Sequence, residues 1–216
     1  GMMPQDLAAQ ECEFPDPISV LYRGHRVWEI PPNGQGITAL MALNILSGIE
    51  LSSMKHNSAE YLHTLIEALR LAFADAGSYV ADPRFFKAPV SELLSAEYAA
   101  SRGKLIDPKK ASVDVVSGSP TRSSCTVSFS VVDGNGNACT MLNSNYMGFG
   151  TGVSPLNTGF TLHNRGRNFS LEKGHPNALE PRKRPYHTII PGVGCDWSAM
   201  WPLSFLMFVC RPIAQE

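Results

Sequence analysis

Residues 126–142 read TVSFSVVDGNGNACTML and carry the pattern of a β-hairpin. Between residues 126 and 132, polar and apolar side chains alternate with a period of two, which is typical of a β-strand. Residues 133–137 combine Asp, Asn and Gly, which tight turns favour, and residues 138–142 return as a partner strand. The stretch therefore predicts a buried, antiparallel hairpin whose first strand begins at Thr126.

The residues in front of this hairpin have a different character. Residues 107–125 lose apolar periodicity, and we expect residues 116–125 to form an exposed connector. A threonine that begins a chain can use its own α-amino group, with a pKa of about 8, as the base that activates its hydroxyl. Cleavage between Cys125 and Thr126 would create such a threonine. Composition alone, however, favours the simpler interpretation of Thr126 as one more β-branched strand residue.

The first hundred residues predict two strands followed by helices. Residues 19–23 and 27–30 read as strands around Gly24, and a helix of about 12 residues is expected from Gln35. A second helix is expected from an N-cap at Asn57 to a stop at Gly77, and Ser95 is expected to cap a third that runs toward residue 103. The apolar positions of the second helix are Leu62, Leu65, Ile66, Leu69 and Phe73. Helices and a hairpin together predict an α+β fold.

Composition limits the classes of function. The 216 residues are 44% apolar and 17% charged with a net charge of -1, which describes a globular protein without the basic surface that nucleic acid requires. The five cysteines show no CxxC spacing, which argues against a zinc site and a disulfide scaffold. No signal peptide or membrane-spanning stretch is recognisable, so we expect a soluble chain of unknown compartment. The basic run at residues 182–184 is expected to be a solvated loop.

Motifs spread over nearly the whole chain resemble the gamma-glutamyltranspeptidase (glutathione hydrolase) family. They are EIPPNGQG (29–36), EALRLAFAD (67–75), DP (82–83), TVSFSVVD (126–133), GNA (136–138), FGTG (149–152), NFS (168–170), KRP (183–185) and TIIP (188–191). The resemblance implies part of the four-layer α/β/β/α sandwich of the N-terminal-nucleophile hydrolases, with no cofactor and no metal. It also implies self-cleavage between Cys125 and Thr126, with Thr126 as the nucleophile.

The resemblance assigns further site residues and also marks departures. Ser144 matches a threonine that tunes the nucleophile. Asn168 replaces the aspartate that holds the substrate ammonium, which removes a countercharge, and Arg165 replaces a glutamine, which adds a partner for a carboxylate. Tyr146 replaces an asparagine, and His187 and Thr188 replace a serine pair that binds the substrate carboxylate; His187 reads equally well as a satisfied, partly buried histidine. These departures resemble the divergent branch that includes glutaryl-cephalosporin acylases.

Three segments follow from the resemblance. Residues 1–125 match the C-terminal part of the large subunit, residues 126–194 match the N-terminal part of the small subunit, and residues 195–216 form a tail without resemblance. The family's oxyanion-hole glycines and a substrate-binding arginine are not found, so we expect a chain that is incomplete at both ends and inactive by itself.

Three functions are open at this point. The first is transfer of an acyl group from a γ-glutamyl amide to Thr126 and then to water or an amino acid. The second is hydrolysis of a glutaryl-type amide, and the third is a non-catalytic, truncated product. The expected partners are a small-molecule amide and, from one precursor, the two subunits.

Overall fold

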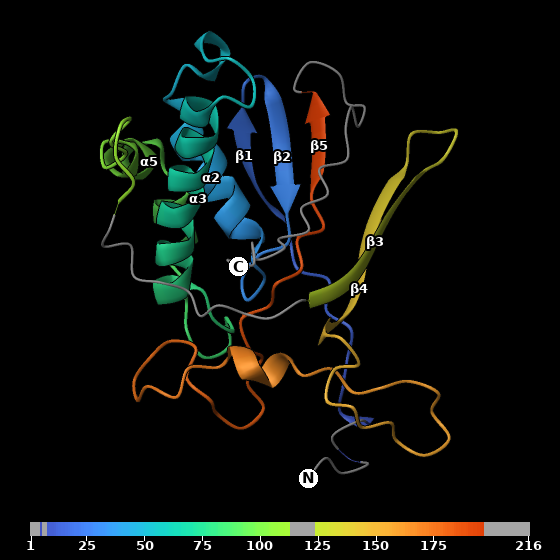
Figure 1. The fold of residues 1–216 in the computed structure, drawn as a ribbon. Coiled ribbons are helices and arrows are strands. Elements are labelled where there is room, and N and C mark those ends of the chain that lie inside the picture. Colours follow the sequence, from blue (N-terminus) through green and yellow to red (C-terminus); the bar gives the residue numbers. More distant parts are fainter. Residues whose placement is uncertain (1–4, 6–7, 113–123, 197–216) are drawn as a thin grey trace.

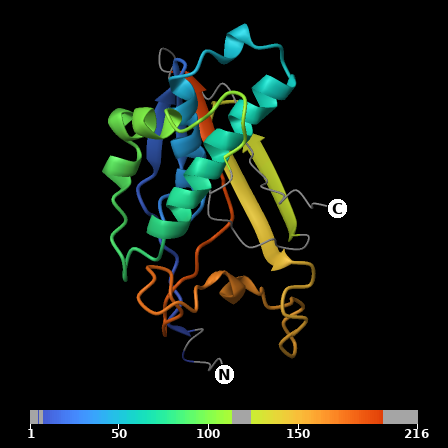
Figure 2. The same ribbon diagram turned by 60° about the vertical axis from the view of Figure 1, so that its left-hand side comes forward.

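The computed structural model describes residue 5 and residues 8–112 and 124–196. This part of the chain mixes helices and strands, as the sequence predicts. Figure 1 shows three groups of elements, with helices on one side, a three-stranded sheet in the middle and a separate hairpin on the other side. The same order is visible after a rotation in Figure 2.

The three-stranded sheet is antiparallel and has the order β1-β2-β5. Strands β1 (Ile18–Tyr22) and β2 (His25–Glu29) form the expected hairpin. Arg23 and Gly24 form its turn with φ values of 50° and 86°, which is the left-handed geometry of a type I′ turn. Strand β5 (Val193–Asp196) pairs with β2, so the sheet joins the first and last described segments. The first two residues of the expected tail complete β5, and residues 197–216 lie outside the described residues.

Helix α2 (Gly36–Ser47) covers one face of this sheet and forms the centre of the core. Its side chains Ile37 and Leu40 are fully buried, and Leu40 packs against Val20 and Val27 of the sheet. On its other side α2 contacts α3 (Ala59–Tyr79) and α5 (Ala96–Gly103). The short elements η1 (Leu51–Ser53) and α4 (Val90–Leu93) complete this helical layer.

Helix α3 differs from its prediction at both ends. Asn57 adopts a left-handed backbone with φ of 58°, and Ser58 is the N-cap, where its hydroxyl accepts a hydrogen bond from Tyr61 N. The helix also continues past Gly77 to Tyr79. The Ser95 cap of α5 is confirmed, because its hydroxyl accepts from Tyr98 N.

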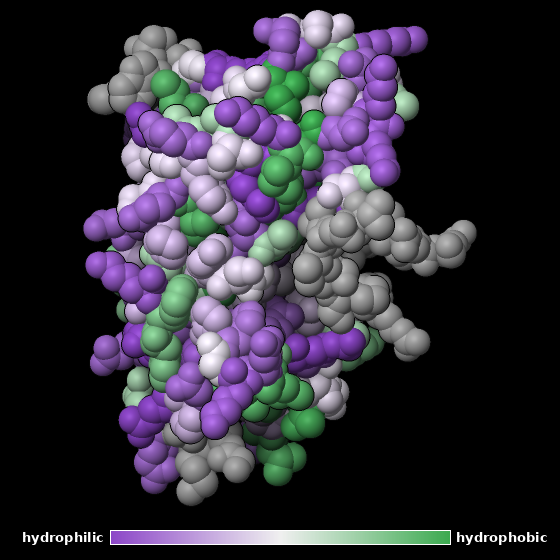
Figure 3. Space-filling view, turned by 90° about the vertical axis from the view of Figure 1, so that its left-hand side faces the viewer, coloured by the Kyte–Doolittle hydropathy of each residue, from purple (hydrophilic) through white to green (hydrophobic). Residues whose placement is uncertain are grey.

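The buried face of α3 consists mainly of small and polar residues, with Leu71 as its one buried large apolar side chain. Ala68, Ala72 and Ala76 are at most 1% exposed, because α2 approaches this face closely. A second, apolar stripe points away from α2 and is between 36% and 46% exposed; it consists of Leu62, Ile66, Leu69 and Phe73. Hydrophobic side chains are visible among hydrophilic ones on the helical face of the molecule in Figure 3.

The predicted hairpin consists of β3 (Ser124–Val132) and β4 (Ala138–Met147). Asp133 closes the turn by accepting hydrogen bonds from the backbone N–H groups of Asn135 and Asn137. The expectation of a buried strand is wrong for the described chain. Strand β3 pairs only with β4 among the described strands, and Val127 and Val131 are 66% and 58% exposed. No described element covers this apolar face.

The segment after β4 is mostly loop and is organised by polar contacts. It contains one turn of 3-10 helix, η2 (Arg165–Asn168). The buried side chain of Asn177 joins two parts of this segment, since it donates to Asn168 O and accepts from Tyr186 N. Among the described helices, none is long and apolar enough to cross a membrane.

Candidate active site

Thr126 and Ser144 lie opposite each other on the hairpin. Their hydroxyl oxygens are 3.0 Å apart, with Thr126 donating to Ser144, and both residues are half-buried. The strand register shifts between Cys125 and Thr126, because Cys125 pairs with Tyr146 and Thr126 pairs with Ser144. Asn145 is therefore the extra residue of a β-bulge, a device that redirects side chains next to many active sites.

The bulge also fixes the position of Tyr146. Its backbone is left-handed, with φ of 75°, and its N–H donates to the Ser144 hydroxyl over 2.9 Å. Its ring is buried and lies beneath the guanidinium of Arg165, whose Cζ is 5.7 Å from the ring centroid. A continuous path thus runs from the Thr126 hydroxyl through Ser144 and Tyr146 to Arg165.

Arg165 is the most unusual charged group of this cluster. It is only 2% exposed, and its Nη1 donates to the Thr188 hydroxyl over 3.1 Å. None of the ion pairs formed by described residues includes Arg165. Burial lowers the pKa of the guanidinium, with a smaller opposing effect of Tyr146. A buried cation without a carboxylate partner is suited to bind an anionic ligand.

Two histidines interact electrostatically with Arg165. Burial, together with the smaller effects of the charges of Arg165 and His163, lowers the pKa of His187 to about 4. The pKa of His163 is lowered in turn by burial and by Arg165. His187 is therefore neutral at pH 7 and interacts electrostatically with the cluster. His163 was not singled out from the sequence, where only its position two residues before Arg165 could have indicated it.

Asn168 has a different environment from the other predicted site residues. Its side-chain amide donates to Tyr186 O over 2.9 Å, and its backbone oxygen accepts from Asn177. The structure thus brings together Thr126, Ser144, Tyr146, Arg165 and Thr188, whereas the amide N–H of Asn168 holds a loop. Cys125, expected at the end of the connector, is already part of β3, so the strand begins before Thr126.

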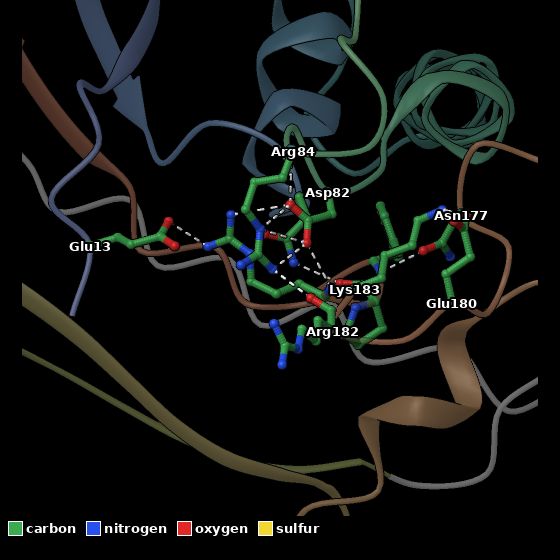
Figure 4. A network of polar contacts seen from close by, with 11 residues as sticks. Glu13, Asp82, Arg84, Asn177, Glu180, Arg182 and Lys183 are labelled. Atoms are coloured by element: carbon green, nitrogen blue, oxygen red, sulfur yellow. Dashed lines mark hydrogen bonds and ion pairs between the residues drawn. The ribbon is translucent and has the colours of Figure 1, made fainter. Parts of the chain in front are cut away.

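The basic run at residues 182–184 is not the solvated loop that its composition indicates. Lys183 is 8% exposed, forms an ion pair with Glu180 and lies over the ring of Phe85. Arg184 contacts the fully buried carboxylate of Asp82 (Figure 4). The prediction fails because Lys183 packs over Phe85 and because Arg184 is one of the cationic partners that the buried Asp82 carboxylate needs.

An open groove adjoins this basic run and is separate from the Thr126 cluster. It is lined by residues of the segments 5–15, 30–34, 83–92 and 182–189. Of the predicted site residues only His187 contributes to it. Among the described residues, no group of three or more His, Cys, Asp or Glu side chains is arranged to hold a metal ion.

Comparison with known proteins places this arrangement in a family. The profile of the family described as Gamma-glutamyltranspeptidase matches residues 1–201. The glutathione hydrolase-like YwrD proenzyme of Bacillus subtilis (strain 168) is 39% identical over 90% of this chain and 36% of its own length. The acylase ACY 1 proenzyme of Pseudomonas sp. (strain SE83) is 33% identical over 88% of this chain and 35% of its own length.

A solved structure supports the same relationship. The crystal structure of cephalosporin acylase from Bacillus halodurans superimposes with a TM-score of 0.80 and 45% identity, over 93% of this chain and 35% of that one. The chain spans about a third of the length of these relatives. The extent of the profile match and these identities show that the chain belongs to the gamma-glutamyltranspeptidase family, which includes close acylase relatives.

Proposed function

We propose that this chain carries the nucleophile and part of the substrate site of an amide-cleaving acyltransferase. Cleavage between Cys125 and Thr126 frees the α-amino group of Thr126, and the Thr126 hydroxyl then attacks a γ-glutamyl or glutaryl amide. The observation that carries this proposal is the 3.0 Å hydrogen bond between Thr126 and Ser144 at a β-bulge. Names of relatives that include the word proenzyme agree with a cleavage step.

The chemistry proceeds in two balanced steps. Thr126 Oγ1 forms a bond with the amide carbon, and its proton passes to the free α-amino group. The amide C–N bond breaks, the leaving amine takes that proton, and an ester on Thr126 remains. Water, or an amino acid in the transfer reaction, attacks the ester with the same amino group as base and restores the hydroxyl. Ser144 holds the Thr126 hydroxyl in one orientation before the attack.

Arg165 is proposed to bind the carboxylate at the far end of the acyl group. Its burial and its position over Tyr146 connect it with Thr126, and Thr188 holds its Nη1. His187 lies in the same electropositive surroundings and contributes to binding of the anion. Glutaryl and γ-glutamyl groups both end in such a carboxylate.

Hydrolysis of a glutaryl-type amide is the second candidate, and Asn168 favours it. A neutral amide at this position supplies no countercharge for the α-ammonium of a γ-glutamyl group. The relatives named acylase agree with this alternative.

The architecture proposed for the whole protein is a four-layer α/β/β/α sandwich. Residues 1–125 would belong to the large subunit and residues 126–194 to the small one, with the Cys125–Thr126 bond as their boundary. Residues 195–216 are proposed as a separate tail, of which the family profile matches residues 195–201. The arrangement of helices on one side of the sheet and the hairpin on the other supports this assignment (Figure 1).

The decisive test is Thr126→Ala in the protein expressed from its complete coding sequence. The wild-type protein should appear as two bands on a denaturing gel, and N-terminal sequencing of the smaller band should read Thr-Val-Ser-Phe. The variant should remain a single, uncut chain, because it lacks the attacking hydroxyl. Ser130→Ala is the matched control, since it removes another cross-strand hydroxyl pair, with Thr140 at 3.3 Å, from the same hairpin. An uncut wild-type chain would favour the non-catalytic alternative.

Asn168→Asp separates the two substrate classes. If Asn168 faces the acyl group, the new carboxylate should raise the ratio of γ-glutamyl to glutaryl turnover. A hydrogen bond to a charged group is worth about 1.5–3 kcal/mol, so the ratio should change about ten- to a hundredfold. The measurement is steady-state hydrolysis of γ-glutamyl-p-nitroanilide against glutaryl-p-nitroanilide. An unchanged ratio would mean that Asn168 serves only the contact with Tyr186.

A further inference from the structure

Residues 184–188, which we term the strap, lie between two layers of polar contacts. On one side, the N-terminal half of the chain holds them: Arg184 N donates to Asp82 Oδ2 over 2.7 Å, and Asn33 Nδ2 donates to Pro185 O over 2.7 Å. His187 belongs to the same side, since its N–H donates to Asn33 O and its oxygen accepts from Gln35 N. Three of the five strap residues are thus fixed by residues that precede Thr126.

The two remaining residues of the strap form hydrogen bonds with the segment that follows β4. Tyr186 N donates to Asn177 Oδ1, and Tyr186 O accepts from Asn168. Thr188 accepts the hydrogen bond from Arg165 Nη1. The position of Arg165 therefore depends, through the strap, on contacts with the N-terminal half of the chain.

Asp82 is the charged anchor of the strap. It is fully buried, and its carboxylate accepts two side-chain hydrogen bonds from Arg84 Nε, one from Arg84 Nη2 and one from Arg184 Nη2. Burial alone would raise the pKa of Asp82, but the hydrogen bonds from Arg84 and Arg184 outweigh it and hold the pKa well below its usual range. Figure 4 shows the side chain of Arg84 beside this carboxylate. The anchor is thus ionised throughout the neutral pH range.

We propose that Asp82 is a positioning residue for the carboxylate site, acting through the strap and Thr188 on Arg165. Asp82 precedes the Cys125–Thr126 bond and the strap follows it, so the same contacts hold the two pieces together after cleavage. This inference rests on the proposed function of Arg165. It differs from that proposal in placing the control of substrate binding on a residue that touches neither Thr126 nor Arg165.

The test is Asp82→Asn in the protein expressed from its complete coding sequence. The substrates are glutaryl-p-nitroanilide and butyryl-p-nitroanilide, which has the same carbon chain without the carboxylate. The variant should raise KM for the glutaryl substrate about tenfold or more, the effect of weakening one hydrogen bond between charged groups. Its kcat for that substrate and its kcat/KM for the butyryl substrate should change less than about threefold. An equal loss on both substrates, or no loss on either, would overturn the proposal.

Two further variants keep the result interpretable. Glu180→Gln is the matched control, because Glu180 pairs with Lys183 beside the strap without contacting residues 184–188, and KM should stay within about twofold of the wild type. Should Asp82→Asn fail to fold, Asn33→Ala replaces it. That variant removes the neutral hydrogen bond to Pro185 O and should raise the glutaryl KM in the same selective way by a smaller factor.

Binding of glutarate distinguishes failure of this inference from failure of the proposed function. If the wild type has no turnover, the proposed function fails, and calorimetric titration with glutarate still tests the strap. Weaker glutarate binding by Asp82→Asn than by the wild type would support the positioning role. Equal binding, or no binding by the wild type, would contradict it.

Discussion

The sheet β1-β2-β5 and the hairpin β3-β4 are both antiparallel, yet the apolar side chains of their strands have opposite environments. Val20 and Val27 of the sheet are 6% and 2% exposed beneath Leu40 of α2. Val127 and Phe129 of the hairpin are 66% and 46% exposed. Alternation therefore identifies a strand, whereas burial depends on the presence of a second layer. The sheet provides stability and the hairpin carries the candidate chemistry.

The largest expected difference between the two regions concerns their cores. Leu40→Ala should lower the free energy of unfolding of this chain by about 2–5 kcal/mol, because it opens a cavity in a closely packed site. Phe129→Ala should cost less than about 1 kcal/mol, since the ring is half exposed before the change. Urea unfolding of the two variants and the wild type measures both values. Equal losses would mean that another surface covers the hairpin face in solution.

A buried carboxyl group at the end of β2 gives a second way to compare the sheet with the hairpin, namely by the pH dependence of stability. Burial raises the pKa of Glu29 to about 8, against a smaller opposing effect of the Ile30 backbone N–H. The folded state thus binds its proton more tightly than the unfolded state does. The stabilisation that results from this tighter proton binding is fully present below pH 4.5, the ordinary pKa of the group, and is lost as the pH rises through 8.

Glu29→Gln should therefore stabilise the protein at alkaline pH. Since each pKa unit corresponds to about 1.4 kcal/mol, the gain at pH 9 should be of the order of 5 kcal/mol, and it should shrink toward pH 4.5. Urea unfolding at several pH values between 4.5 and 9 checks this. A gain that does not vary with pH would show that Glu29 has an ordinary pKa.

The smallest expected effect lies in the hairpin turn and has the opposite pH dependence. Hydrogen bonds from the side chain and backbone of Asn137 lower the pKa of the exposed Asp133 carboxylate. Its contribution to stability is present above pH 3.8, its ordinary value, and is lost as the pH falls through the folded-state value. Asp133→Asn should lower the melting temperature slightly at pH 7 and leave it unchanged at pH 2. An equal effect at both values would assign the loss to turn geometry rather than to charge.

Local signals in the sequence predicted the secondary structure well. The Gly24 turn, the 12-residue helix α2, the Ser95 cap and the hairpin turn each depend on neighbouring residues alone. The N-cap of α3 was displaced by one residue because Asn57 can adopt a left-handed backbone, which leaves Ser58 as the cap.

The polar organisation of the site was accessible only in part. Thr126, Ser144 and Arg165 were identified through family resemblance, and their spatial connection depends on a bulge that no local pattern predicts. The contact of Arg184 with Asp82 could not be predicted, because the two residues lie 102 residues apart in the sequence, and the burial of Lys183 depends on the similarly distant ring of Phe85. Exposure of the α3 stripe depends likewise on which face α2 contacts.

The long separation between Asp82 and the strap has a consequence for folding order. Contacts between distant residues close late, because the entropy of loop closure opposes them until other structure has formed. The β1-β2 hairpin, α2 and α3 all lie within residues 18–79, so a ribosome-bound chain can assemble them before Arg184 is synthesised. During that interval Asp82 remains hydrated. Arrival of the strap then desolvates this carboxylate and aligns Arg165 in the same step, so that the site matures only on a scaffold that is already folded.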